Sequence, residues 1–343
     1  MSMSPLKFLS LAWFTPVMGL AGLSLAWARA ASLMGSAAEV LSTALAMLAF
    51  AVFLVLMVLQ LRRAVQFPQA VAEDLNHPVR HAFVATIPVG LLLLIACGVR
   101  WFGPQSWLSI LWFGVASAQL WVTWWVLSKW LKPSASDANG VTTPMWAGIT
   151  PVLFVPVVGN VVAPLAGIAL GHTAWSVMQA SIGLFFWPLV LLLVLARRAA
   201  HSVLPDRLLP TWFISVAPPS VLGVVAHQLQ APVWVMQMAW AMAFFSLLWV
   251  APVLVRAWRA GFHMGFWALS FPLAALASLT LALGDRMAAP ELIDPSFLIQ
   301  RLSVPVLAMV SGVIFMLCLM TLRGIRNGTL LVAEPVPVPV KPA

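Results

Sequence analysis

Long apolar stretches separated by short polar connections run through almost the whole chain. A helix of roughly 20 apolar residues is long enough to cross the hydrocarbon core of a bilayer. The pattern predicts ten such spans, near residues 8–28, 38–61, 82–99, 105–128, 146–169, 174–196, 209–229, 232–255, 263–284 and 302–322. Because the connections are too short to hold a soluble domain, we expect a single all-α polytopic membrane domain over residues 1–326.

The two ends of the chain carry weaker signals. Lys7, an apolar run and the sequence ARAAS at 28–32 have the outline of a cleaved signal peptide. The run is long for such a peptide and contains Pro16, which belongs to the repeat described next, so we expect the first span to be retained. Residues 327–343 end in alternating Pro and Val, which predicts an extended, disordered cytoplasmic tail.

The odd-numbered spans share a short motif. Each has a proline some five to ten residues after its start, namely Pro16, Pro88, Pro151, Pro218 and Pro272. Each also has a hydroxyl side chain one to three residues before the proline, namely Thr15, Thr86, Thr150, Ser215 and Ser270. Successive prolines are 54 to 72 residues apart, about the length of a helical hairpin. The motif therefore predicts a two-helix unit that is repeated five times.

The repeat predicts a ring of helices. Every odd span crosses the membrane in the same direction, so its proline lies at the same depth as the other four. Proline removes a backbone hydrogen bond and bends a helix. We expect the five kinked odd helices to form an inner pore ring and the even helices an outer ring. The alternative is that the kinks only shape packing, with each hydroxyl satisfying a carbonyl freed by proline.

Composition supports a membrane protein, and the charges orient it. Of the 343 residues, 62% are hydrophobic and 8% are charged, with a mean hydropathy of +1.01. In the ten-span arrangement, 14 of the 18 Lys and Arg residues fall on one side. The positive-inside rule then predicts that both termini are cytoplasmic. The net charge of +9 is thus mainly a topology signal, and we expect a lipid bilayer rather than nucleic acid as the partner.

The middles of the odd spans carry no charged side chain. A charge at the bilayer centre usually marks a proton relay or a coupling site, so its absence argues against a proton pump with a buried carboxylate. The histidines fall at span ends or in connections, and Cys97 and Cys318 lie in apolar spans. We therefore expect no metal site, no cofactor and no enzyme. Hydroxyl groups and the amide of Asn160 favour easily dehydrated anions, because their hydrogens replace part of the hydration shell.

Several segments resemble a known family. They are GLAGLSLAWARA (19–30), HPVRHAFVATIP (77–88), GVASAQLW (114–121), ISVAPPSVLGVVAH (214–227) and GFWALSFPLAALA (265–277). The chain resembles, from Leu11 to about Arg323, the tellurite-resistance/dicarboxylate transporter family, which includes bacterial TehA and the slow anion channels of plant guard cells.

The resemblance implies a fold and a gate. It implies ten helices in five hairpins, a pore in each protomer of a homotrimer, and conduction of chloride and nitrate in the bacterial inner membrane. It also implies that a phenylalanine of the ninth helix occludes the pore, and the matching position is Phe271. The alternatives are a secondary carrier that exports an oxyanion or a C4-dicarboxylate, of the tellurite, sulfite or malate type, and a non-conducting scaffold or sensor.

Overall fold

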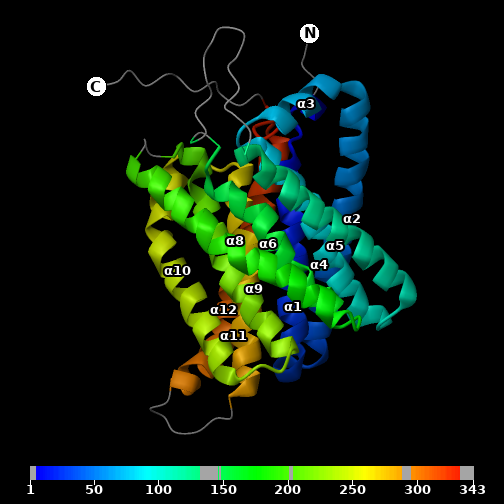
Figure 1. Cartoon of the computed structure of the whole chain (residues 1–343), viewed down its shortest axis with the longest axis vertical. Helices are drawn as coiled ribbons and strands as arrows, with labels where there is room; N and C mark the ends of the chain where they lie inside the picture. The colour runs from blue at the N-terminus through cyan, green and yellow to red at the C-terminus, as the bar shows by residue number, and fades with distance from the viewer. Residues whose placement is uncertain (1–4, 132–145, 147, 201–203, 288–294, 333–343) are drawn as a thin grey trace.

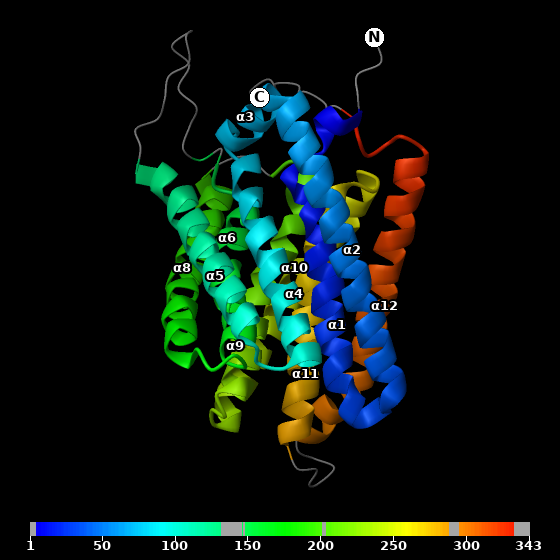
Figure 2. The same cartoon turned by 90° about the vertical axis from the view of Figure 1, so that its right-hand side faces the viewer.

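The protein is a bundle of long helices. The computed structural model describes residues 5–131, 146, 148–200, 204–287 and 295–332. The long helices lie roughly along the long axis of the bundle, some pointing up it and some down (Figures 1 and 2). The described part of the chain contains no strand. Nine of the described helices are long and apolar enough to cross a membrane. The predicted all-α membrane fold is therefore confirmed.

The helices that match the even-numbered spans are long and regular. They are α2 (Ser36–Gln66), α5 (Ser106–Ser128), α8 (Thr173–Ala200), α10 (Val233–Arg259) and α12 (Pro295–Arg326). A short extra helix, α3 (Pro68–Asn76), follows α2 at the end of the bundle where the described chain begins. Phe67 precedes Pro68 with φ −134° and ψ 56°, outside the helical region, because proline disfavours a helical residue before it, so α2 ends there.

The odd-numbered spans begin with a 3₁₀ turn and then continue as an α-helix. Four of them are η2–α1 (Leu11–Phe14, Thr15–Met34), η3–α4 (Arg80–Ala85, Thr86–Phe102), η7–α9 (Asp206–Val216, Ala217–Gln228) and η8–α11 (Met264–Leu269, Ser270–Arg286). The motif prolines of these four spans lie in the first turn of the α-helix. The first N–H groups of an α-helix have no partner within it, so proline costs little there. The predicted kink is thus a change of helix type.

The fifth span is broken. It consists of η6 (Pro151–Leu153), α6 (Phe154–Val162) and α7 (Pro164–Gly167), and at 17 residues it is shorter than the nine long spans. Pro151 begins the 3₁₀ turn here, whereas Pro156 takes the first-turn position that the motif proline holds elsewhere. Pro164 has no N–H to donate to the preceding turn, which explains why α6 does not continue. The span expected near residues 146–169 is therefore a 3₁₀ turn followed by two short helices.

Burial separates the helices into two groups. In the four long odd spans, 72%, 78%, 89% and 100% of the most apolar window is buried, against 17% to 39% in the five even spans. The buried helices also contact one another in a closed circuit. In chain order, α1 packs against α4, α4 against α6, α6 against α9 and α9 against α11, and α11 packs against α1. The α-helices of the odd spans are therefore inside the bundle, and the even helices cover them.

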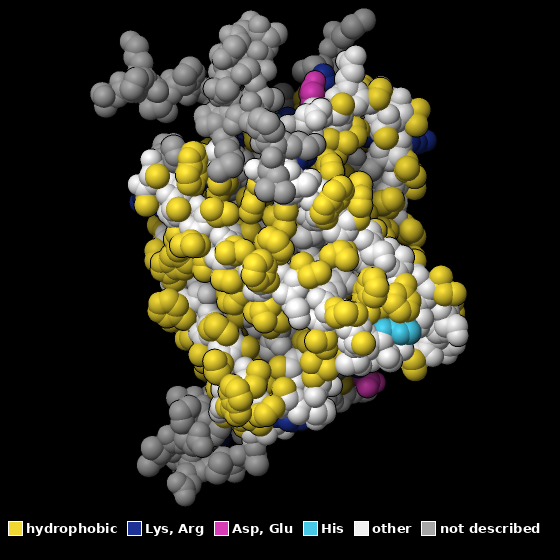
Figure 3. Space-filling view, viewed as in Figure 1, with side chains coloured by type: hydrophobic (Ala, Val, Ile, Leu, Met, Phe, Trp, Pro, Cys, Tyr) yellow, Lys and Arg dark blue, Asp and Glu magenta, His cyan; other side chains and the backbone are white. Residues whose placement is uncertain are grey.

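The exterior of the bundle is apolar between its two ends. Side chains such as Ile110, Phe185, Phe245 and Phe315 project from even helices with more than 60% of their surface exposed. Figure 3 shows hydrophobic side chains over most of the lateral face, with the charged ones near the ends. In water such a surface would be unfavourable, whereas a lipid environment satisfies it.

Candidate functional site

Two cavities open at opposite ends of the bundle, and no residue lines both. The first, which we call the distal cavity, has a volume of about 420 Å³ and is lined by residues of all five odd spans. The second, the proximal cavity, has a volume of about 540 Å³ and lies beside the described ends of the chain, at Lys7 and Leu330. A passage through the inner helices would connect them.

The lining of the distal cavity follows the helical repeat. α1 contributes Gly22, Leu25 and Arg29; α4 contributes Leu93, Ala96, Val99 and Arg100; α9 contributes Val221, Val224 and Gln228; α11 contributes Phe271, Ala275 and Ser278. In each helix the first and the last of these positions are seven residues apart, which is about two turns along one helix face. Because these helices run in parallel, each supplies one residue near the bundle centre and one near the distal end of the bundle.

Phe271 lies at the deep end of the distal cavity. Its side chain is 4% exposed, and it is the first of the three α11 positions that line the cavity. A Cβ atom at Gly22 would lie 3.0 Å from Cδ2 of Phe271 and 3.3 Å from Cβ of Ala274. A Cβ atom at Gly19 would collide with Ser270. α1 and α11 therefore approach closely at the Phe271 ring only because two glycines face it.

The predicted prolines and hydroxyls lie near the stretch of the bundle that separates the two cavities. In the third span, Phe83 of η3 lines the proximal cavity and Leu93 of α4 the distal one, with Thr86 and Pro88 between them. In the same way Ser215 and Pro218 lie between the lining residues of η7 and α9, and Ser270 lies between those of η8 and α11. We call this stretch the closed section. Thr15 borders it and lines the proximal cavity, Pro16 follows Thr15, and Pro272 follows Phe271.

Four of the five predicted hydroxyls donate to backbone carbonyls three residues earlier. The Oγ atoms of Thr15, Thr86, Ser215 and Ser270 lie 2.6, 2.6, 2.8 and 2.7 Å from the carbonyl oxygens of Ala12, Phe83, Trp212 and Trp267. These bonds satisfy carbonyls at the junction between the 3₁₀ turn and the α-helix. The hydroxyl of Thr150 is buried without a described hydrogen-bond partner. In this conformation the four bonded hydroxyl hydrogens are therefore directed to the backbone.

Asn160 is part of a buried amide network and lines neither cavity. Its Nδ2 donates to Oγ1 of Thr123 at 2.8 Å, and its Oδ1 accepts from Nε2 of Gln179 at 3.2 Å. Gln119 of α5 donates to the carbonyl of Pro156 of α6 at 2.8 Å, which is an interhelical hydrogen bond. The network joins α5, α6 and α8 around the proline-rich fifth span, and the contacts of Asn160 favour a packing role.

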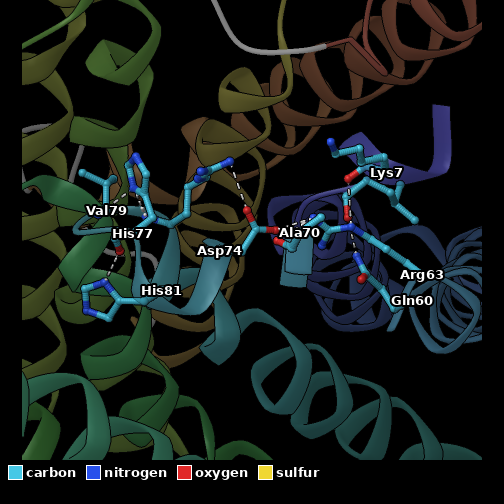
Figure 4. Close-up of polar contacts among 10 residues, drawn as sticks. Lys7, Gln60, Arg63, Ala70, Asp74, His77, Val79 and His81 are labelled. Atoms are coloured by element: carbon cyan, nitrogen blue, oxygen red, sulfur yellow. Dashed lines mark hydrogen bonds and ion pairs between the residues drawn. The ribbon is translucent and has the colours of Figure 1, made fainter. Parts of the chain in front are cut away.

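A buried ion cluster beside the proximal cavity escaped the sequence analysis. Asp74 of α3 lies 2.8 Å from Nη2 of Arg63 and 3.0 Å from Nη1 of Arg80, and the Arg63 and Asp74 side chains are each 3% exposed. Arg63 also donates to the carbonyls of Lys7 and Ala70. Figure 4 shows Asp74 between Arg63 and the His77–His81 segment. The signal in the sequence was an acidic residue six positions before Arg80, in a chain with few acidic residues.

His77 organises the turn that carries Arg80. Its Nδ1 accepts hydrogen bonds from the backbone N–H groups of Val79 and Arg80, both at 3.1 Å. The HPVR sequence is thus a turn in which a histidine replaces missing backbone partners, and Nη1 of Arg80 in this turn lies 3.0 Å from Asp74. The basic residues Lys7, Arg63, Arg80 and Arg207 all line the proximal cavity, against Glu73 and Asp74.

The proximal histidine His263 is neutral at pH 7. Burial, helped by the positive charge of Arg207, lowers the pKa of His263 from 6.5 to about 4. Its Nδ1 accepts from the N–H of Gly265 at 3.2 Å and so caps η8. Within the described ranges, no group of three His, Cys, Asp or Glu residues could hold a metal ion. His201 lies outside the described residues.

The chain matches a known protein family over most of its length. The family model described as SLAC1, voltage-dependent anion channel, covers residues 9–322. Similar proteins include the S-type anion channel SLAH2 of Arabidopsis thaliana, at 23% identity over 66% of this chain and 42% of the plant protein. The chain therefore spans less than half of that relative.

Two other relatives are covered more completely. A tellurite resistance protein TehA homolog of Haemophilus influenzae is 25% identical over 79% of this chain and 80% of its own length. A sulfite efflux pump, SSU1 of Trichophyton rubrum, is 23% identical over 70% of this chain and 72% of its own length. The similarity thus extends across bacterial, plant and fungal membrane proteins.

Proposed function

The chain belongs to the SLAC1 family of voltage-dependent anion channels, and from this premise we propose that it is a gated channel for small monovalent anions such as chloride and nitrate. The observation that carries the proposal is the distal cavity, which all five odd spans line and which ends at Phe271. A pore for an ion must be enclosed by helices on all sides, and these helices contact one another in a closed circuit.

Phe271 is the gate of this pore. Its ring fills the space beside Gly22 where the distal cavity ends. Conduction requires the ring to leave that position, because an apolar constriction excludes water and hydrated ions. The closed section, with its prolines and hydroxyls, is the part of the passage that opens with the ring. Ala275 and Ala274 are small neighbours on α11, so a rotated ring meets little resistance on that side.

Selectivity for anions arises from two features. The proximal cavity contains four basic side chains and two acidic ones, so it concentrates anions at one end of the passage. The closed section holds no charged side chain, so no fixed cation traps a passing anion there. An anion that enters must shed part of its hydration shell, which favours weakly hydrated monovalent anions.

The protein functions in the bacterial inner membrane, with both termini in the cytoplasm. The apolar lateral surface and the nine long helices support a membrane location, and the similarity to a bacterial TehA homolog supports the inner membrane. The excess of basic residues at the proximal end supports the orientation. We further propose a homotrimer, as the family resemblance implies, in which each protomer has its own pore, since residues of one chain line both cavities. Native mass spectrometry of the purified protein tests the trimer.

The test is the anion current of the parent protein and of Phe271→Ala in planar bilayers, first in chloride and then in nitrate. We expect a small current in the parent and a rise of at least about tenfold in the variant, because removing the ring opens an apolar constriction. Phe154→Ala is the matched control: Phe154 is a fully buried phenylalanine of an odd span that lines neither cavity. A silent Phe271→Ala variant, or an equal rise in Phe154→Ala, would contradict the gate.

A second candidate is a carrier that exports an oxyanion or a dicarboxylate. It is favoured by one observation, the similarity to a sulfite efflux pump. A carrier saturates at low turnover and couples its substrate to a driving ion, whereas the current of a channel scales with the driving force. Proteoliposomes test this candidate through the uptake of labelled sulfite or malate. Uptake in the absence of chloride and nitrate currents would contradict the channel and support the carrier.

A further inference from the structure

Basic residues at the distal end are rare and concentrated. Only Arg29, Arg100, Arg286 and Arg301 belong to the distal side of the ten-span arrangement. The positive-inside rule gives no reason for arginine there, yet two of the four, Arg29 and Arg100, line the distal cavity. Arg29 lies five residues before the end of α1, so it is not merely a residue of the connecting loop. These positions need another explanation.

The distal cavity changes from apolar to polar along its length. The deep and middle positions of α1, α4 and α9 are Gly, Leu, Ala or Val, and those of α11 are Phe271 and Ala275. The outermost position of each helix is polar: Arg29, Arg100, Gln228 and Ser278. We call these four residues the distal rim. Arg29 is seven residues beyond Gly22, so its Cα lies about 10.5 Å farther along α1 than the level of the Phe271 ring.

The two rim arginines are held close together. Nη2 of Arg100 donates to the carbonyl of Ala28 at 3.4 Å, which places the Arg100 guanidinium beside α1, one residue from Arg29. The charges of Arg29 and Arg100 repel each other, and the one described carboxylate that acts on Arg29 is Asp285. Arg286 is bound to Gln230 and to the carbonyl of Ala231, and it adds a further positive charge near His227. Two like charges at one cavity repel each other, and an anion bound between them relieves the repulsion.

We propose that the distal rim is a binding site for an oxyanion of the nitrate or carboxylate type, clamped by the guanidinium groups of Arg29 and Arg100. A guanidinium donates two parallel N–H bonds to two oxygens of one anion, a geometry that a spherical halide cannot use. The apolar wall behind the rim strengthens these bonds by excluding water. This inference deepens the proposed function, on which it rests, because it gives the uncharged pore a charged entry site that prefers oxyanions to chloride.

A direct binding measurement tests the site independently of conduction. The purified full-length protein is heated in detergent with increasing malonate, nitrate or chloride, and the three sodium salts are compared at equal ionic strength. A ligand that binds the folded state raises the denaturation temperature with its concentration. We expect malonate and nitrate to stabilise the parent protein at lower concentrations than chloride does.

Two variants separate charge from geometry. In the double variant Arg29→Gln/Arg100→Gln, we expect the concentration of malonate or nitrate needed for half of the effect to rise at least about tenfold, because charge-assisted hydrogen bonds are lost. In Arg29→Lys/Arg100→Lys, the charge remains and the fork is lost, so we expect stabilisation by chloride to persist and the preference for oxyanions to disappear. Arg301→Gln, another distal arginine that does not line the cavity, should behave like the parent.

The outcomes are distinct for the two proposals. The site is overturned if the parent shows no stabilisation by oxyanions, if the double Gln variant retains it, or if Arg301→Gln loses it equally. Failure of the channel proposal has a different signature: Phe271→Ala carries no anion current, while the parent protein still binds malonate through its rim arginines.

Discussion

At the scale of single residues, the site depends on close contact between a glycine and a ring. Gly22 lines the distal cavity beside Phe271, and any side chain there would meet both the ring and Ala274. The sequence marked Phe271 through its motif and Gly22 only as one of many glycines in membrane helices. For the hydroxyls, the sequence predicted the positions but not the contacts. Their spacing identified the junctions of the odd spans, whereas their bonds to carbonyls three residues earlier followed only from the 3₁₀ geometry.

The substitution Gly22→Ala tests this contact. The added methyl group would lie 3.0 Å from Phe271 and 3.3 Å from Ala274, so either the ring or the α1–α11 spacing must shift, at a cost of about 1–3 kcal/mol. We expect a lower denaturation temperature and a changed anion current in a bilayer recording. Gly114→Ala is the control, because nothing lies within 4 Å of a Cβ atom at that helical glycine. Equal behaviour of the two variants would show that the Phe271 contact is unimportant.

At the scale of elements, proline positions and one small helix decide how the spans are arranged. The prolines lie where a 3₁₀ turn becomes an α-helix, which is why they recur without breaking the four long odd spans. The fifth span breaks before Pro164, and an amide network from α5 and α8 surrounds it. At the proximal end, α3 supplies Asp74, the acidic partner that the buried Arg63 requires.

The ion cluster of α3 predicts a large difference between two Asp→Asn substitutions. Asp74→Asn leaves the guanidinium of Arg63 buried without its charge partner, and we expect a loss of about 3–5 kcal/mol of stability. Asp206→Asn breaks a pair of similar length, 2.7 Å to Arg256, whose side chains are 46% and 53% exposed. That loss should be about 0–1 kcal/mol, because water screens exposed pairs. Denaturation temperatures in one detergent measure both.

Two results would contradict these expectations for the α3 cluster. If Asp206→Asn lowers the denaturation temperature as much as Asp74→Asn does, burial is not what makes the α3 cluster important. If Asp74→Asn has no effect, α3 is not anchored through Arg63.

At the scale of the whole molecule, the two ends of the bundle differ in charge and the lateral face is apolar. Charged side chains lie near the ends, and exposed aromatic and aliphatic side chains of the even helices cover the middle (Figure 3). The proximal end carries most of the Lys and Arg residues, and the distal end carries a small cluster of arginines around a cavity. This difference in Lys and Arg content between the two ends sets the orientation of the protein in the membrane.

Single cysteines test the orientation. Cys97 and Cys318 are first replaced by Ala; then Ser36→Cys is placed at the distal end and Asn327→Cys at the proximal end, both at exposed positions. In intact bacterial spheroplasts we expect a membrane-impermeant maleimide to label Ser36→Cys, and to label Asn327→Cys only after the membrane is opened, because the basic end faces the cytoplasm. The reverse labelling pattern would invert the topology and with it the side on which the distal rim faces.

The sequence by itself determined the membrane class, nine of the ten spans, the repeat and the family, because each of these depends on apolar length and on local motifs. It also identified Phe271 as the candidate gate by resemblance, and the family is confirmed by the match over residues 9–322. It could not determine the interruption of the fifth span, the partner of Arg63 or the meeting of Arg29 and Arg100. Those features bring together residues from different helices, whose contacts arise only when the inner helices pack side by side. Tertiary packing therefore decided which polar side chains are buried, which face a cavity, and which merely mark an end of the bundle.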